Sequence, residues 1–195
     1  MGNNKITRSW QRMLSGRRLD LTEPSPLDIE IEDIARGISR VARWNGQTIG
    51  EHALSVAQHS VIVTNFLKIH DNKIPIKWQL AALLHDAAEY IVSDMITPLK
   101  LFLGDEYTDL EERIQGAINL RFSLPREVPK TIYKKIKICD KQTAFLEAIQ
   151  LAGFRESEAR KTFQVPKFVP KYKISPLSSV EAEKLFLKKF NQLYK

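Results

Sequence analysis

Cysteine is almost absent from this chain of 195 residues, in which Cys139 is the only one. An intramolecular disulfide is therefore excluded, and so is a zinc site built mainly from cysteine within one chain. Any metal site must use His, Asp or Glu side chains. Glycine and proline are also sparse, with 8 and 9 residues, which excludes collagen-like and low-complexity sequence.

Long apolar segments are lacking as well. Apolar runs in the middle of the chain, such as Ala81–Leu84, are far shorter than the roughly 20 residues of a membrane-spanning helix. The first residues, Met1–Ile6, contain neither the apolar core of a signal peptide nor a myristoylation motif. We therefore expect a cytoplasmic protein without a membrane segment.

Positive charge is concentrated at one end of the chain. The sequence has 30 Lys and Arg residues against 23 Asp and Glu, a formal net charge of +7. Residues 155–195 contain ten basic and four acidic residues, a net +6. These basic residues form no recognisable RNA-binding motif, and a solvated surface accounts for them. A nucleic-acid partner is not expected.

Apolar residues recur at three- and four-residue steps over most of the chain, which is the spacing of amphipathic helices. Strand patterns are nearly absent. The spacing, together with glycine and proline breaks, predicts helices over residues 32–43, 53–70, 76–91, 98–121, 132–151 and 179–193. The expected fold class is all-α: a single domain over residues 1–195, built as an irregular bundle of about six helices.

The segments at both ends of this bundle are expected to differ from its core, which should lie at about residues 32–151. Residues 1–27 are polar and broken by glycine and proline, so they are predicted to form an extended N-terminal arm. Within the basic segment 155–195, residues 163–176 contain three prolines and are predicted to form an extended crossover before the last helix.

The predicted helix over residues 76–91 is apolar on nearly every face, yet it contains His85, Asp86 and Glu89. Burying an unpaired carboxylate costs several kcal/mol, so these groups need a cation or a dense hydrogen-bond network. In a helix, Glu89 lies one turn from the other two. His59 and Asp140 also lie near apolar helix faces. Taken singly, such residues are usually satisfied by neighbouring groups, so their spacing alone leaves both a metal site and this simpler interpretation open.

The order of these residues resembles a known signature. His59, then His85–Asp86, then Asp140 look like the H…HD…D pattern of the HD-domain metal-dependent phosphohydrolases. The string Leu84–Glu89, which reads LHDAAE, is similar to the H-D-A-x-E string of the 5′-deoxynucleotidase (YfbR-like) branch. The resemblance covers roughly residues 32–151.

Further strings refine this resemblance. Arg43–Trp44 matches the Arg-Trp pair of the nucleotidase branch, and Ser93–Asp94 is similar to its Gly-Asp pair, with Ser93 in the place of glycine. Ala57–Gln58 stands where that branch has Ser-Glu. The arm Gly16–Asp20 and the string Ser55–Ser60 look more like short HD proteins that include phage dATP triphosphohydrolases.

The resemblance implies an activity and a set of roles. It implies that a metal-activated water cleaves the 5′-phosphoester of a deoxynucleotide, in the manner of a dATP-type triphosphohydrolase or of a 5′-nucleotidase. Glu89 would act on the attacking water, Asp94 would assist it or hold the sugar, Arg43 would hold phosphate, and Trp44 would line the nucleoside pocket. The ligands of one divalent cation, Mn, Co, Fe or Mg, would be His59, His85, Asp86 and Asp140. A homo-oligomer with a small nucleotide as substrate is also implied.

Alternatives remain open at this stage. His52 lies seven residues before His59, and the string Glu51–Leu54 imitates part of the motif. Two helical turns separate the two histidines by about 10 Å, so one ion cannot easily bind both. We expect His59, deeper in the apolar helix, to be the ligand. Other functions to weigh are an HD hydrolase of cyclic nucleotides or guanosine tetraphosphate, and a non-catalytic, metal-containing binding module that uses the basic tail.

Overall fold

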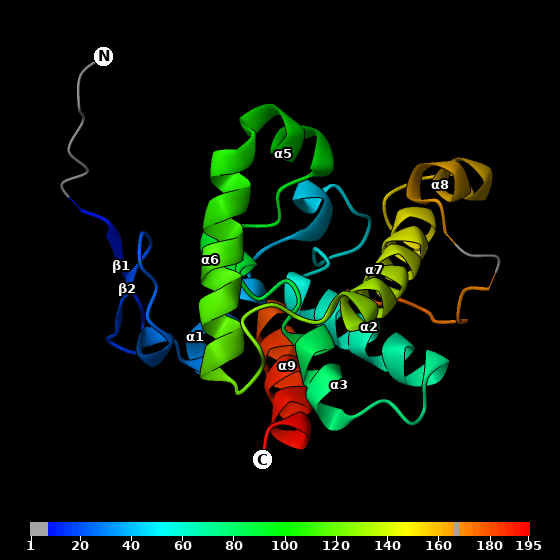
Figure 1. Cartoon of the computed structure of the whole chain (residues 1–195). Coiled ribbons are helices and arrows are strands. Elements are labelled where there is room, and N and C mark those ends of the chain that lie inside the picture. Colours follow the sequence, from blue (N-terminus) through cyan, green and yellow to red (C-terminus); the bar gives the residue numbers. More distant parts are fainter. Residues whose placement is uncertain (1–7, 166–167) are drawn as a thin grey trace.

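A computed structural model describes residues 8–165 and 168–195, and this part of the chain forms nine α-helices and one small sheet (Figure 1). None of the described helices is long and apolar enough to cross a membrane. The strands are β1 (Trp10–Arg12) and β2 (Arg18–Asp20), and the helices are α1 (Ile31–Ile38), α2 (Val56–His70), α3 (Ile76–Leu83), α4 (Glu89–Val92), α5 (Thr97–Leu103), α6 (Asp105–Arg121), α7 (Lys130–Gln150), α8 (Glu156–Phe163) and α9 (Ser179–Leu193).

Helix α2 lies at the centre of the core. Eleven of its 15 residues are buried, and it packs against α3, α7 and α9. The C-terminal helix α9, red in Figure 1, also contacts α1 and α3, so it joins the first and third helices of the bundle. Because neighbours cover α2 on several sides, its polar side chains are buried too, among them His59, Ser60 and Thr64.

The predicted all-α class is confirmed, although the expected number of about six helices is too low. The last predicted helix agrees with α9 at both ends. A capping box explains its sharp start: the Ser178 hydroxyl accepts from the Glu181 N–H, and the Glu181 carboxylate accepts from the Ser178 N–H. The predicted crossover over residues 163–176 is confirmed in part: Phe163 is the last residue of α8, and residues 164–165 and 168–176 contain neither helix nor strand. Pro166 lies outside the described residues.

The predicted N-terminal arm is extended but contains an antiparallel hairpin that the sequence did not indicate. Strands β1 and β2 pair with Trp10 opposite Asp20. The guanidinium groups of Arg8 and Arg18 lie 4.4 and 4.7 Å from the centre of the Trp10 ring, a distance at which a cation is attracted to the face of an indole. Residues 1–7 of the predicted arm lie outside the described residues.

The prediction of one continuous helix over residues 76–91 is wrong, and the break matters for function. Helix α3 ends at Leu83, and α4 begins at Glu89. Between them, the side-chain amide of Gln115 on α6 donates to the Leu84 carbonyl at 2.8 Å and accepts from the Ala88 N–H at 3.1 Å. These bonds satisfy backbone groups that a continuous helix would pair internally. His85 and Asp86 therefore lie in a turn rather than in a helix.

Other parts of the helix prediction also differ from the structure. The predicted helix 32–43 ends at Ile38, and Arg43–Gly46 forms a separate 3₁₀ turn. The predicted helix 98–121 is divided into α5 and α6 at Gly104, whose φ of +75° suits glycine. Helix α8 was not predicted at all. It buries only Ala159, so it lacks the apolar period on which sequence prediction depends.

Candidate metal centre and active site

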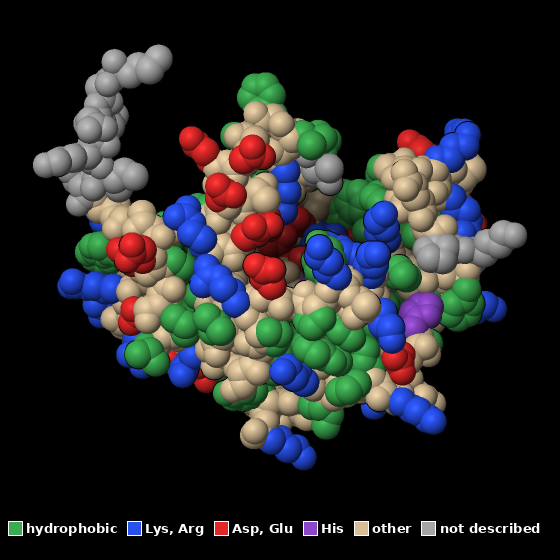
Figure 2. Space-filling view, viewed as in Figure 1, with side chains coloured by type: hydrophobic (Ala, Val, Ile, Leu, Met, Phe, Trp, Pro, Cys, Tyr) green, Lys and Arg blue, Asp and Glu red, His purple; other side chains and the backbone are tan. Residues whose placement is uncertain are grey.

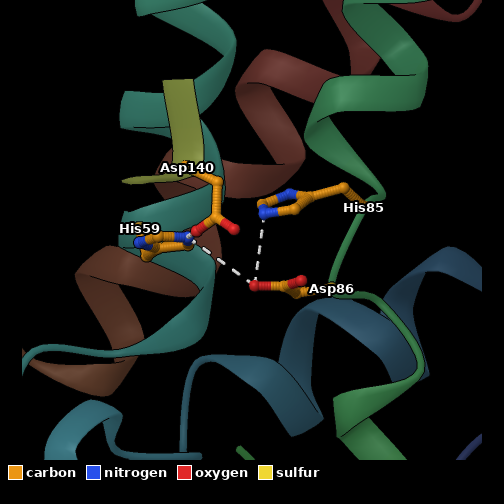
Figure 3. A group of neighbouring side chains, drawn as sticks. All are labelled: His59, His85, Asp86 and Asp140. Atoms are coloured by element: carbon orange, nitrogen blue, oxygen red, sulfur yellow. Dashed lines mark ion pairs between the residues drawn. The ribbon is translucent and has the colours of Figure 1, made fainter. Parts of the chain in front are cut away.

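Four side chains that are far apart in the sequence meet in the interior (Figure 3). One ligand atom from each lies within 4.8 Å of the others. Asp86 Oδ2 lies 3.6 Å from His59 Nε2 and 3.2 Å from His85 Nε2, and Asp140 Oδ1 lies 3.3 Å from His59 Nε2. The cluster combines α2 (His59), the turn after α3 (His85 and Asp86) and α7 (Asp140). The structure thus brings together the four predicted metal ligands.

The other nitrogen of each imidazole is already engaged. His59 Nδ1 lies 2.6 Å from Glu147 Oε1, and His85 Nδ1 lies 2.9 Å from the carbonyl oxygen of Ala82. A carbonyl only accepts, so His85 Nδ1 donates to it, and Nε2 is the nitrogen that faces Asp86. Both Nε2 atoms are buried without a well-aligned hydrogen bond. Two such nitrogens facing two carboxylates match the ligand set of a divalent cation, with the Nδ1 partners fixing the rings.

The charges of the cluster also favour a cation. Burial raises the pKa of Asp86, but His85 outweighs it and holds the pKa below its usual range. Burial opposes ionisation of Asp140 as well, and His59 and Lys137 overcome it and lower the pKa of that carboxyl. Both carboxylates are therefore ionised at neutral pH. Such a group of buried negative oxygens could hold a divalent metal ion.

Glu147 on α7 connects the cluster to two more predicted site residues. Its side chain is fully buried. Besides His59, it accepts from Trp44 Nε1 at 3.0 Å and faces Arg43 Nε and Nη2 at 3.4 Å. Burial raises the pKa of Glu147, but the charges of Arg43 and His59 outweigh burial and lower the pKa to about 2. The sequence analysis did not single out Glu147, although its position seven residues after Asp140 places it on the same helix face.

Arg43 bridges the carboxylates at one side of the cluster. Its Nη1 lies 3.1 Å from Asp94 Oδ2 and 4.0 Å from Asp86 Oδ2. The next two residues, Trp44 and Asn45, have φ values of 59° and 50°. Non-glycine residues rarely adopt this left-handed conformation, which costs of order 1–2 kcal/mol per residue. Strain of this kind is often retained where it positions functional side chains.

The indole of Trp44 packs against two phenylalanine rings beside the cluster. Its ring centre lies 5.7 Å from that of Phe154 and 5.8 Å from that of Phe163. Trp44 remains partly exposed. The two phenylalanines were not predicted as site residues, because they belong to the neighbourhood of the unpredicted helix α8.

Glu89 is the first residue of α4 and is buried. Burial raises its pKa, and the negative charges of Asp86 and Asp94 raise it further, to about 10. Its Oε2 atom has no hydrogen-bond partner among the described residues. A buried carboxyl with a strongly shifted pKa next to a charged cluster is typical of a catalytic acid or base.

Two other polar residues, His52 and Lys100, lie away from the cluster. His52 is exposed in the loop before α2 and is not part of the cluster, so His59 is the histidine that faces the two aspartates. Lys100 on α5 forms an ion pair with Glu111 on α6, with 3.0 Å between Nζ and Oε1. This pair links α5 to α6 rather than contacting the four clustered side chains.

Comparison with known proteins identifies the family. The profile of the YfbR-like 5′-deoxynucleotidases matches residues 31–192. This chain belongs to that family. It is a metal-dependent phosphohydrolase of the HD superfamily, as the H…HD…D residues and the match together show. The matched range includes all the predicted site residues.

Three relatives show how similarity to this chain is distributed. An uncharacterised protein of Rhodobacter capsulatus is 54% identical over 161 residues, which cover 83% of this chain and 82% of that protein. The uncharacterised protein YfdR of Escherichia coli is 28% identical over 185 residues, covering 95% of this chain and 96% of YfdR. A 5′-deoxynucleotidase of Cronobacter sakazakii is 34% identical over 74 residues, 35% of this chain and 37% of that enzyme.

The substitution of Ser93 for the glycine of the nucleotidase motif has a structural cost. Ser93 has φ 65° and ψ 163°, a region that is almost restricted to glycine and costs of order 1–3 kcal/mol for other residues. We expect Ser93→Gly to raise the free energy of unfolding by about 1 kcal/mol, because glycine removes the strain but gains unfolded-state entropy. Thermal denaturation should show a rise in Tm of about 2–4 °C.

Ser157→Gly in α8 is the matched control, since Ser157 is exposed and has a helical backbone. Glycine is unfavourable in a helix, so this variant should leave Tm unchanged or lower it. An equal rise in both variants, or no rise for Ser93→Gly, would contradict the strain at Ser93.

Metal affinity should depend on pH through His59. Burial and the charge of Arg43 lower the pKa of His59, but Glu147 and Asp140 overcome them and raise it to about 9. The metal-free protein therefore holds a proton on His59 at pH 7, and a ligand histidine must lose it. We expect the binding constant for Mn²⁺ to rise by about tenfold per pH unit from pH 7 and to level off near pH 9.

Isothermal titration calorimetry in two buffers of different ionisation enthalpy would count the released protons. About one proton released at pH 7 and about a quarter of a proton at pH 9.5 is the expected pattern for a His59 pKa of about 9. A binding constant that does not change between pH 7 and pH 9 would show that His59 is neutral in the metal-free protein.

Proposed function

We propose that this protein hydrolyses the 5′-phosphoester of deoxynucleotides, releasing a deoxynucleoside and inorganic phosphate or tripolyphosphate. The observation that carries the proposal is the convergence of two imidazole nitrogens and two ionised carboxylates on one point, next to Arg43 and Trp44. The name of the Cronobacter sakazakii relative supports the deoxynucleotide as substrate. We assign one divalent cation to His59, His85, Asp86 and Asp140.

The bound cation would make a water molecule more acidic and neutralise negative charge on the phosphate. The remaining work belongs to the side chains around the cluster. Arg43 is held on one edge by Glu147, so its Nη1 points toward Asp86 and Asp94. A planar guanidinium fixed in this way can hold a phosphate oxygen with a charge-assisted hydrogen bond.

Glu89 and Asp94 supply the acid–base groups of the proposal. Burial is the largest cause that raises the pKa of each carboxyl. The charge of Asp86 raises both pKa values further, because both carboxyls lie close to it. We assign Glu89 to proton transfer with the attacking water. Asp94, paired with Arg43 at 3.1 Å, would assist Glu89 or hold the sugar.

Trp44 is assigned to the nucleoside. Its Nε1–H is tied to Glu147, so the ring has a fixed orientation, while Phe154 and Phe163 support its sides. A partly exposed aromatic ring held in place offers a stacking surface for a base at low entropic cost. Because base stacking tolerates every base, this contact favours a nucleoside without selecting among the four.

The test is hydrolysis by metal-stripped protein with Mn²⁺, Co²⁺ or Mg²⁺ added back. The substrates are deoxynucleoside mono- and triphosphates and their ribose counterparts, and the products are identified as nucleoside, orthophosphate or tripolyphosphate. We expect metal-dependent release of the deoxynucleoside. Asp86→Ala should abolish the release, whereas Asp105→Ala, at an exposed position on α6, should not. No release with any metal would overturn the proposal and redirect the search to cyclic nucleotides and guanosine tetraphosphate.

A further inference from the structure

One glutamine on α6 takes the place of a single backbone hydrogen bond between α3 and α4. In a continuous helix, the Ala88 N–H would donate to the Leu84 carbonyl, four residues earlier. Instead, the side-chain amide of Gln115 lies between these two groups: its Nε2 donates to Leu84 O at 2.8 Å, and its Oε1 accepts from Ala88 N at 3.1 Å. The Leu84 carbonyl also closes a tighter turn, accepting from the Ala87 N–H at 3.0 Å. The amide therefore holds the helix open at one bond.

The opened turn contains two of the four clustered side chains, His85 and Asp86. In a regular helix, neighbouring side chains leave the axis about 100° apart, whereas here His85 Nε2 and Asp86 Oδ2 lie 3.2 Å apart. These two residues are only partly buried, while Leu84 and Ala88 on either side of them are buried. Packing therefore holds the ends of the turn, and hydrogen bonds set the path of the backbone between them.

A second amide fixes which way the Gln115 amide faces. Gln115 Nε2 also donates to Asn119 Oδ1 at 3.1 Å, one turn further along α6, and Asn119 Nδ2 donates to the carbonyl of Arg126 at 2.9 Å. Both hydrogens of the Gln115 amide are thus used, and so is its oxygen. If this amide turned over, its nitrogen would face the Ala88 N–H and its oxygen would face two acceptors. The three partners together exclude that reversed orientation.

Gln115 reaches the turn from the side of a pocket. The pocket has a volume of about 890 Å³, and Gln115, Asn119 and His85 all line it. In Figure 2, acidic side chains gather in a recess between α6 and α7. Gln115 is itself partly exposed, and a partly exposed amide buries little apolar area. Its contribution to the fold therefore lies mainly in its hydrogen bonds with the turn and with Asn119.

The chain contains a matched arrangement at Gln150, near the end of α7. Gln150 Nε2 donates to the Tyr172 carbonyl at 2.9 Å, and its Oε1 accepts from the Ile174 N–H at 3.0 Å. Gln150 is partly exposed, like Gln115. Each glutamine thus donates one bond to a backbone carbonyl and accepts one from a backbone N–H. Only the pair formed by Gln115 encloses members of the cluster, so the two glutamines separate an effect on the site from an effect on stability.

We propose that Gln115 is a positioning residue for the metal site: it keeps the turn open, so that His85 and Asp86 reach the same cation. This inference rests on the cation assigned under the proposed function, and it concerns the geometry of the ligands rather than the reaction. Without the amide, the Ala88 N–H is free to bond to the Leu84 carbonyl and complete the helix, which would turn the two side chains apart. A purely structural glutamine would instead stabilise the fold without affecting metal binding.

The experiment measures the Mn²⁺ dissociation constant and the EPR spectrum of bound Mn²⁺ for the full chain in three forms: the wild type, Gln115→Met and Gln150→Met. Methionine has nearly the length of glutamine but lacks the amide, so each variant loses one pair of bonds to the backbone. We expect Gln115→Met to weaken Mn²⁺ binding by about 10–100-fold, the effect of removing a group that orients metal ligands, and to alter the EPR spectrum. Gln150→Met should match the wild type in both measurements.

Asn119→Ala provides a second variant, which decides the question if Gln115→Met does not fold. It leaves both bonds between Gln115 and the turn in place and removes only the acceptor that fixes the direction of the amide. We expect a several-fold loss of Mn²⁺ affinity relative to Gln150→Met. Thermal denaturation of the metal-free proteins shows whether each variant is folded before Mn²⁺ is added.

The outcomes separate this inference from the proposed function. Wild-type Mn²⁺ affinity in Gln115→Met, or an equal loss in both methionine variants, would overturn the positioning role and leave the proposed function intact. If Gln115→Met does not fold, wild-type affinity in Asn119→Ala overturns it. A wild-type protein that binds Mn²⁺ but cleaves no deoxynucleotide would overturn the proposed function, and the comparison of the variants would still decide the role of Gln115. A wild-type protein that binds no divalent cation would overturn both.

Discussion

Glu89→Gln should lower kcat by about 10²–10⁴-fold, the range in which a general acid or base contributes to catalysis. The amide cannot exchange a proton with the attacking water, but it has nearly the same shape as the carboxyl. Because the pKa of Glu89 is raised to about 10 by burial and by Asp86 and Asp94, this carboxyl is neutral at pH 7 in the metal-free protein. Replacing one neutral group by another should therefore leave the free energy of unfolding of that protein almost unchanged.

This combination distinguishes a catalytic role from a structural one. Steady-state kinetics with Mn²⁺, thermal denaturation of the metal-free protein and the Mn²⁺ binding constant would be measured on the same variant. Glu23→Gln, an exposed glutamate after β2, is the control and should match the wild type in all three. If Glu89→Gln loses metal binding together with activity, Glu89 belongs to the ligand set rather than to the proton-transfer step.

Glu147→Ala should be among the most destabilising single substitutions in the chain. It removes the carboxylate that neutralises Arg43, accepts from Trp44 and holds His59 at 2.6 Å. Leaving buried charge without its partner costs about 3–5 kcal/mol, which for a chain of this size lowers Tm on the order of 10 °C. Above pH 9, where a proton on His59 no longer competes with the metal, loss of the partner that orients His59 should also lower the affinity for Mn²⁺ by about 10–100-fold.

Glu147→Gln provides the second arm, because it keeps an oxygen that can accept from His59 or Trp44 but removes the charge. Compared with Glu147→Ala, it should recover part of the free energy of unfolding. KM for the substrate should stay above the wild-type value, because Arg43 loses the charge that orients it. Tm, the Mn²⁺ binding constant and tryptophan fluorescence report the three contacts separately. If Glu147→Ala changed Tm by no more than Glu158→Ala, an exposed glutamate on α8, the three contacts would have little energetic weight.

The sequence was informative where local pattern and chemistry coincide. The helical period predicted α9 to the residue. Polar residues near apolar helix faces made His59, His85, Asp86 and Asp140 candidates, and the resemblance to the HD signature implied that they share one site. The structure brings one ligand atom of each within 4.8 Å of the others. A buried polar residue can be recognised in the sequence because the residues around it in the chain are apolar. The assignment of these residues to a metal remains a proposal that the metal-binding measurements test.

The parts that could not be predicted depend on residues far away in the chain. The turn that carries His85 exists because Gln115, thirty residues later, binds Leu84 and Ala88, and a window of the sequence around His85 contains no sign of this. The left-handed backbone at Trp44 is likewise stabilised by tertiary contacts against its local preference. Glu147 lacked a motif of its own, since its importance lies in three partners that only the fold brings to it.

The distribution of the four clustered side chains has a consequence for folding kinetics. His59, Asp86 and Asp140 come from α2, the turn after α3 and α7, so the site is complete only when these three segments have docked. Contacts between residues so far apart in sequence form late. A cation that binds there should therefore slow unfolding and leave the refolding rate nearly unchanged, because stabilising contacts absent from the transition state act on the unfolding limb. The metal would stabilise the helical bundle after it has folded rather than direct its folding.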